Sequence, residues 1–229
     1  MSSELKITSL LADALSSFHF SGYQLVAEHG ASTLNLSEGK TAHWGKVDDV
    51  TPGTFFDLGS LTKIIFTTSC LARAVDRNDV DLESILSEFV PEFKDTPYGK
   101  VKVSDLLAHA SGLKGWLPIY ETLGKKTLVE WFLTHSKVTF ETMPRKKAIY
   151  SDLGFLLLGM VIQKVWGSLD KAMQAEIVSP LGLKTVQFPP LKKTASVAAT
   201  EFCLYRKRLL QGEVLDENTS VLDGKSCHA

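Results

Sequence analysis

The amino-acid sequence predicts an α+β fold, in which an antiparallel sheet is flanked by helices and receives a mainly helical lobe as an insertion. Short segments near the N-terminus alternate apolar and polar residues, which is typical of strands. The middle of the chain instead repeats apolar residues at three- and four-residue steps between glycine and proline breaks, which is typical of helices. With 229 residues, 44% of them hydrophobic, the chain can bury a substantial core.

The N-terminal region, residues 1–60, is predicted to contain a helix and short strands. Residues 1–15 combine an amphipathic helical pattern with charged side chains, which favours a surface helix over a signal peptide. Residues 23–28 and 32–36 are predicted to form antiparallel strands. An apolar patch at residues 43–47 predicts a further short strand.

The next region, residues 61–190, is predicted to be mainly helical. After a helix that begins near Ser60, the periodic segments are 82–89, 103–110, 128–135, 152–165 and 169–178. The 152–165 segment is apolar on nearly all sides, so we expect it to lie inside the core.

Ser60 and Lys63 are the first candidates for catalysis. A serine followed three residues later by lysine occurs at five places, but only this pair follows a turn and opens an apolar helix. Residues three apart share a helix face, so the amine can approach the hydroxyl, and the helix N-terminus favours negative charge. This is the pattern of an activated nucleophile. A serine that only caps the helix, beside a solvated lysine, fits the same spacing.

Tyr150, Ser151 and Asp152 open the apolar helix predicted at 152–165. A phenol, a hydroxyl and a carboxylate at the start of a buried helix could transfer protons. A hydroxyl-rich helix cap would explain the same residues without any catalytic role.

Several segments, in order along the chain, resemble the serine beta-lactamase-like superfamily of class C beta-lactamases, DD-peptidases and related esterases. Residues 56–63 resemble its S-x-x-K nucleophile element. Residues 103–113 are similar to its LLxHxSGL loop, 150–155 to its tyrosine element and 180–188 to its PLGM-x-x-T-x-F stretch. The resemblance starts near residue 23 and implies a beta-lactamase/transpeptidase-like fold.

The resemblance implies a serine hydrolase that forms an acyl-enzyme on an ester, amide or beta-lactam-like carbonyl of a small-molecule or peptide substrate. Ser60 would be the nucleophile, Lys63 its base and Tyr150 the proton shuttle to the leaving group. Asp152 would line the substrate site. Neither a metal nor an organic cofactor is implied.

Five further residues are assigned from their context. Trp116 and Tyr120 follow a turn and are candidate substrate-binding residues, although aromatic core packing is about equally compatible. His109, in the LLxHxSGL-like loop, is interpreted as a structural hydrogen-bonding residue. Cys227 and His228 lack a metal-ligand pattern and are interpreted as a tail.

Two features depart from the family pattern. Many family members carry Asn where this chain has Asp152, which weighs against penicillin hydrolysis but not against acyl transfer. Residues 191–229 resemble a loop that leads into further strands and a Lys- or His-containing third element. We therefore expect residues 1–229 to form one partial domain whose sheet is incomplete at its C-terminal end. An exposed sheet edge would permit oligomers.

Two hypotheses of function remain open. The first is a serine hydrolase that uses Ser60, Lys63 and Tyr150. The second is a truncated or non-catalytic relative that keeps the nucleophile segment as a scaffold and acts by binding a ligand or partner.

Composition narrows the setting in which the chain works. Twenty-five basic and 26 acidic residues leave a net charge of −1, which does not favour a nucleic-acid partner. The sequence contains no uninterrupted apolar run of membrane length. Three cysteines without a disulfide pattern fit a reducing compartment, so a cytoplasmic location is expected.

Overall fold

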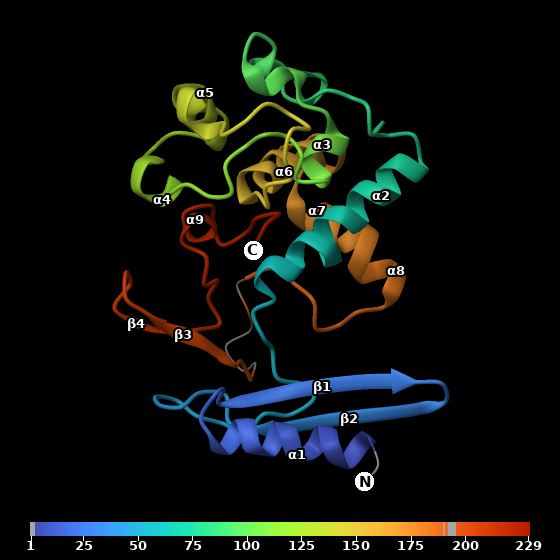
Figure 1. Cartoon of the computed structure of the whole chain (residues 1–229), viewed down its shortest axis with the longest axis vertical. Helices are drawn as coiled ribbons and strands as arrows, with labels where there is room; N and C mark the ends of the chain where they lie inside the picture. The colour runs from blue at the N-terminus through green and yellow to red at the C-terminus, as the bar shows by residue number, and fades with distance from the viewer. Residues whose placement is uncertain (1–2, 190, 192–195) are drawn as a thin grey trace. The chain divides into compact units, whose positions relative to one another are not determined.

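The structure is a computed structural model that describes residues 3–189, 191 and 196–229. Internal contacts group the chain into two compact units, whose elements are labelled in Figure 1. The first unit consists of Met1–Asp57 and Pro190–Leu215, and the second of Leu58–Pro189 and Asp216–Ala229. All the candidate catalytic residues belong to the second unit.

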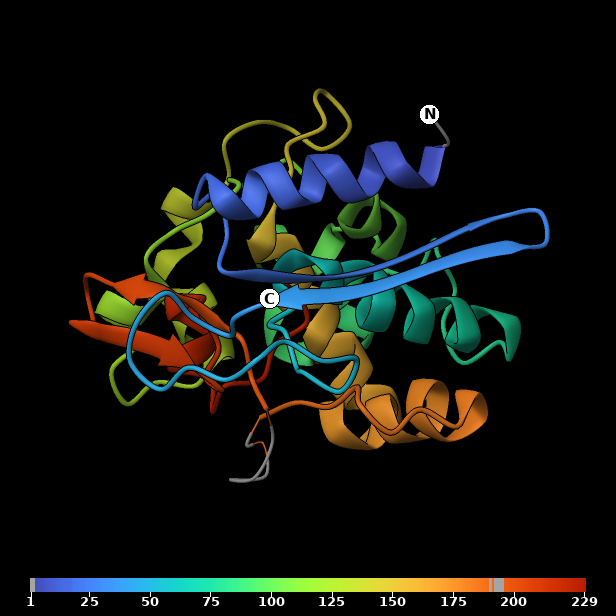
Figure 2. The same ribbon diagram turned by 90° about the horizontal axis from the view of Figure 1, so that it is seen from below.

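The first unit begins with helix α1 (Ser3–Ser16) and the antiparallel hairpin of β1 (Gly22–His29) and β2 (Ser32–Gly39). At the hairpin turn Gly30 has φ +60°, which glycine adopts without strain. Helix α1 runs alongside the hairpin in both views (Figure 2). The predicted N-terminal helix and both predicted strands are confirmed, and each strand is longer than predicted.

A second antiparallel hairpin in this unit joins β3 (Ala199–Cys203) to β4 (Arg208–Gln211). The strand predicted at residues 43–47 does not form. The amide of Thr41 donates to the carbonyl of Asp48 at 2.9 Å, so the chain between them closes as a loop instead of extending along the sheet. The described residues therefore hold two sheets of two strands each.

The second unit is helical in its described part. It contains the 3₁₀ turns η1 (Gly59–Leu61), η3 (Leu86–Glu88), η4 (Pro91–Phe93) and η5 (Pro97–Lys100), and the π-helical segments η2 (Lys63–Thr68) and η6 (Gln174–Val178). Its α-helices are α2 (Ser69–Asp76), α3 (Val103–Leu107), α4 (Ile119–Thr122), α5 (Leu128–Thr139), α6 (Asp152–Trp166), α7 (Leu169–Met173), α8 (Ser179–Leu181) and α9 (Glu217–Ser220).

Helix α6 is the central helix of this unit, as its all-round apolar pattern predicts. Every residue from Leu153 to Ile162 is buried, and α3, α7 and η2 pack against the helix. Ser151 caps its N-terminus by accepting a hydrogen bond from the amide of Gly154 at 3.1 Å. Gly167 ends it in the left-handed conformation, at φ +83°. Burial of each leucine contributes about 2 kcal/mol, so α6 is a firm base for the residues at its start.

Two predicted helices differ from the structure. Residues 82–89 form only the short turn η3, because the amide of Leu86 donates to the carbonyl of Val101 at 2.9 Å instead of to its own segment. The helix predicted from Ser60 starts as the 3₁₀ turn η1 and the π-helical η2 before it becomes regular in α2.

Among the described residues, a search for membrane-spanning helices finds no single helix of sufficient length and apolarity. Helix α6 and the segment Leu169–Leu181 pass that test only together, and a 77° bend separates them.

Candidate active site

Ser60 and Lys63 come together at the junction of η1 and η2. Lys63 Nζ lies 2.9 Å from Ser60 Oγ, as their three-residue spacing predicts. The serine is exposed, whereas the lysine is only 3% exposed. The site thus presents a hydroxyl to solvent and holds an amine behind it.

The buried amine of Lys63 has three oxygen neighbours. Besides Ser60 Oγ, these are Asp152 Oδ1 at 2.7 Å and the backbone carbonyl of His228 at 2.6 Å. Asp152 reaches the amine because it is the first residue of α6. Two of these neighbours, Ser60 Oγ and the His228 carbonyl, accept hydrogen bonds from the amine, and Asp152 supplies an ion pair. Together they offset the cost of burying the charge.

Tyr150 lies beside this cluster, with its ring centroid 4.9 Å from Lys63 Nζ. The ring of Phe155 lies 5.6 Å from the same nitrogen, so two aromatic rings flank the cation. Tyr150 is 57% exposed. Within the described part of the chain, the structure gives its hydroxyl no hydrogen bond to Ser60 or Lys63. Its role as a proton shuttle therefore stays a prediction.

His109 has the structural role that the sequence predicts. Its Nδ1 accepts a hydrogen bond from the amide of Ser151 at 2.9 Å, and its ring centroid lies 4.5 Å from that of Tyr150. Burial lowers the pKa of His109 and the charge of Lys63 lowers it further, against the opposing effect of Asp152. The neutral imidazole therefore packs against the ring of Tyr150.

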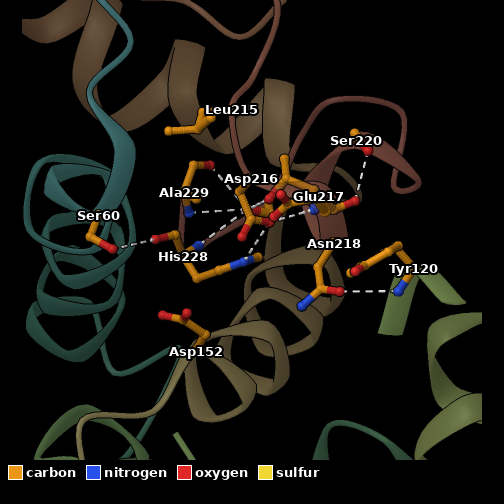
Figure 3. Close-up of polar contacts among 12 residues, drawn as sticks. Ser60, Tyr120, Asp152, Leu215, Asp216, Glu217, Asn218, Ser220, His228 and Ala229 are labelled. Carbon is orange, nitrogen blue, oxygen red and sulfur yellow. Dashed lines mark hydrogen bonds and ion pairs between the residues drawn. The ribbon is translucent and has the colours of Figure 1, made fainter. Parts of the chain in front are cut away.

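Trp116 and Tyr120, the predicted substrate-binding residues, lie before and within α4. Their ring centroids are 6.4 Å apart, and Trp116 is 45% exposed. Asn218 holds this segment at two points. Its Oδ1 accepts from the amide of Tyr120 at 3.0 Å (Figure 3). Its Nδ2 donates to the carbonyl of Leu117, also at 3.0 Å. Substrate binding by the two aromatic residues stays a prediction.

His228, interpreted from sequence as tail, belongs to the site. It is 1% exposed, and its carbonyl accepts from Lys63 Nζ at 2.6 Å. The same carbonyl accepts from Ser60 Oγ at 3.3 Å (Figure 3). No periodicity relates it to Ser60, which lies 168 residues earlier. The paired Cys and His give no metal-ligand spacing, so sequence offered no signal for this contact.

Asp216 is the second residue that sequence reasoning missed. Its Oδ1 lies 3.0 Å from His228 Nε2 and accepts from the amide of Thr219 at 2.6 Å, which caps α9. Burial raises the pKa of Asp216, but the hydrogen bond and charge of His228 outweigh this effect and lower it to about 2. An Asp two residues before an Asn could have been read as a helix cap.

A model of the Beta-lactamase family matches residues 19–201 of this chain. The chain is 35% identical over 207 residues to a Bacillus subtilis (strain 168) protein named N-acetylmuramyl-L-alanine amidase, covering 77% of this chain and 46% of that protein. It is 31% identical over 210 residues to a putative D-alanyl-D-alanine carboxypeptidase of Salmonella gallinarum, covering 78% and 48%. The chain spans about half the length of these curated relatives.

Solved structures with the same fold include a class C beta-lactamase, with a TM-score of 0.73, 20% identity and coverage of 90% of this chain and 58% of that chain. The crystal structure of SurE gives a TM-score of 0.70 at 24% identity, with coverage of 91% and 47%. These likenesses show that the fold is beta-lactamase/transpeptidase-like.

Proposed function

Because the chain belongs to the Beta-lactamase family, we propose that its second unit carries the acylating centre of a serine hydrolase. Ser60 is the nucleophile, Lys63 its base and Tyr150 the proton shuttle. The substrate is a small molecule or peptide with an ester, amide or beta-lactam-like carbonyl. The names of the amidase and carboxypeptidase relatives support hydrolysis of amide or peptide bonds.

The observation that carries this proposal is the 2.9 Å approach of the buried Lys63 amine to the exposed Ser60 hydroxyl. In the neutral state the amine takes the hydroxyl proton while Ser60 Oγ attacks the carbonyl carbon. The tetrahedral intermediate then expels the leaving group, which receives a proton through Tyr150. Water, deprotonated by the same base, attacks the acyl ester and releases the acid, which regenerates the serine.

Asp152 tunes this base. As a carboxylate 2.7 Å from Lys63 Nζ, it stabilises the ammonium form and competes with the neutral amine that attack requires. A lysine that acts as the base must therefore lose a proton before Ser60 Oγ attacks the carbonyl, and the Asp152 carboxylate opposes that loss.

A second candidate function is a non-catalytic binding or scaffold protein. The contact that favours it is the His228 carbonyl, which already accepts from both Ser60 and Lys63 and so occupies the nucleophile in the free protein. A substrate must displace the weaker of these contacts, the 3.3 Å bond from Ser60, before attack can occur.

Intact-protein mass spectrometry with a fluorophosphonate and with a penicillin tests the proposal. We expect one adduct per chain, absent in Ser60→Ala. The adduct should form at least about 100-fold more slowly in Lys63→Arg, because a guanidinium keeps the charge but cannot act as a base. The probe that reacts separates ester-like from penicillin-like preference. A folded chain that forms no adduct with either probe supports the scaffold function instead.

A further inference from the structure

The segment that ends at His228 runs along η2. Thr67 Oγ1 donates to the carbonyl of Cys227 at 2.7 Å, next to the contact of Lys63 Nζ with the carbonyl of His228 at 2.6 Å. Two successive carbonyls of this segment therefore face one π-helical turn. Of these, only the His228 carbonyl reaches the candidate catalytic groups.

The side chain of His228 is held on the other side by α9. Nε2 pairs with Asp216 Oδ1 at 3.0 Å, and Asp216 is fixed in turn because it caps α9 through Thr219. Thr219 Oγ1 also donates to Ser226 Oγ at 2.9 Å, and that oxygen accepts from the amide of His228 at 3.3 Å. The backbone at position 228 is thus tied to α9 through both its imidazole and its amide.

Among the described residues, the imidazole of His228 makes no hydrogen bond to Ser60 or Lys63. The contacts from Ser60 and Lys63 go to the backbone oxygen, and Nδ1 is buried without a hydrogen-bond partner among the described residues. A buried nitrogen of this kind costs about 1–3 kcal/mol. A core packing role alone would be filled at lower cost by an apolar side chain, so the imidazole is present for its contact with Asp216.

We propose that Asp216 and His228 form a positioning pair, whose side-chain contact fixes the His228 carbonyl so that it orients the Lys63 amine beside Ser60 for acylation. This inference rests on the proposed function, because it takes Ser60 as nucleophile and Lys63 as base. Neither residue of the pair touches the reacting atoms with its side chain. A shift of about 1 Å in such a positioning group can cost up to about 100-fold in rate.

Substituting His228 by glutamine or by asparagine distinguishes a positioning role of the side chain from a role in folding alone. The amide nitrogen of glutamine takes the place of Nε2 and can donate to Asp216, whereas that of asparagine takes the place of Nδ1 and cannot. In His228→Gln we expect at least about a third of the fluorophosphonate acylation rate to be retained, and in His228→Asn a loss of about 10- to 100-fold. Asp216→Ala should lose as much, and the double variant Asp216→Ala/His228→Asn no more. His29→Gln, on β1, is the matched control.

A readout that does not depend on activity is the ¹⁵N resonance of the Lys63 ammonium, assigned by its absence in Lys63→Arg. We expect its N–H protons to be protected from solvent exchange in the wild type and in His228→Gln, and unprotected in His228→Asn and Asp216→Ala. Thermal unfolding identifies any variant that fails to fold. If His228→Asn does not fold, the comparison of His228→Gln with Asp216→Ala replaces it.

Equal acylation rates and equal Lys63 protection in the glutamine and asparagine variants would overturn the positioning pair. A wild-type chain that forms no adduct but protects Lys63 in this Asp216-dependent way would overturn the proposed function and leave the pair standing.

Discussion

Lys63 shows how a single buried charge shapes this site. Its amine is surrounded by a hydroxyl, a carboxylate and a backbone carbonyl from three separate segments, each within 2.9 Å. Removing such a cation from water costs several kcal/mol unless its donors are satisfied. The neighbours of Lys63 therefore decide both how well the buried amine is tolerated and how readily it serves as a base.

Asp152 is the neighbour whose effect can be isolated. Asp152→Asn keeps the shape and removes the charge that stabilises the ammonium, so we expect fluorophosphonate acylation at neutral pH to rise several-fold. Stopped-flow or timed mass spectrometry measures the rate. Asp170→Asn, which alters an exposed ion pair with Lys225, is the control and should leave the rate as it is. A slower Asp152→Asn variant would show that the carboxylate takes part as a proton acceptor.

At the scale of elements, Glu176 joins α2 to η6. Its carboxylate, only 4% exposed, accepts hydrogen bonds from Arg77 at 2.8 Å, Arg73 at 3.4 Å and Trp166 Nε1 at 3.0 Å. Burial raises the pKa of Glu176, but the hydrogen bonds from Arg77 and Trp166 outweigh it and lower the pKa overall. This ion-pair cluster therefore braces the helix that follows the nucleophile.

Glu176→Gln should destabilise the protein by about 1–3 kcal/mol, because it leaves the arginines without a buried counter-charge while both remain partly solvated. Urea unfolding at pH 7 measures the change. Because the folded pKa is depressed, the stabilisation is present at pH values above the unfolded pKa and is lost as the pH falls through the folded pKa. Glu92→Gln, at an exposed site, should change stability by less than about 0.5 kcal/mol. A variant as stable as the wild type would contradict the bracing role.

At the scale of the whole molecule, Asp216 contributes to acid sensitivity. Its pKa falls from 3.8 to about 2 on folding, which corresponds to about 2 kcal/mol of stability above pH 5. The pKa is depressed, so this stability is lost progressively as the pH falls from about 5 to about 2.

Unfolding free energies measured by urea between pH 7 and pH 2.5 test this contribution. We expect the acid-dependent decrease to be about 2 kcal/mol smaller in Asp216→Asn than in the wild type. Asp81→Asn, which removes an exposed turn carboxylate, is the control and should keep the wild-type slope. Parallel pH profiles for the wild type and Asp216→Asn would be incompatible with a depressed pKa at this position.

Local patterns account for much of this molecule. The N-terminal hairpin, the buried helix α6 and the Ser60–Lys63 approach all follow from period and spacing, because each depends on residues close together in the chain. The predictions at 43–47, where no strand forms, and at 82–89, where the helix is shortened, were wrong because backbone pairing differs from the local pattern. The amide of Thr41 pairs with the carbonyl of Asp48 and closes a loop, and the amide of Leu86 pairs with the carbonyl of Val101, and neither pairing is encoded by a local period.

The sequence by itself determined the family, the beta-lactamase/transpeptidase-like fold and the candidate nucleophile and base, because these reside in short contiguous motifs. Only the tertiary structure decided that Asp152 and the His228 carbonyl share one buried lysine, and that Asp216 pairs with the imidazole of the same histidine. The physical reason is that a buried ammonium must find acceptors wherever the packed chain supplies them. Those acceptors come from positions up to 165 residues away, at a distance over which side-chain periodicity carries no information.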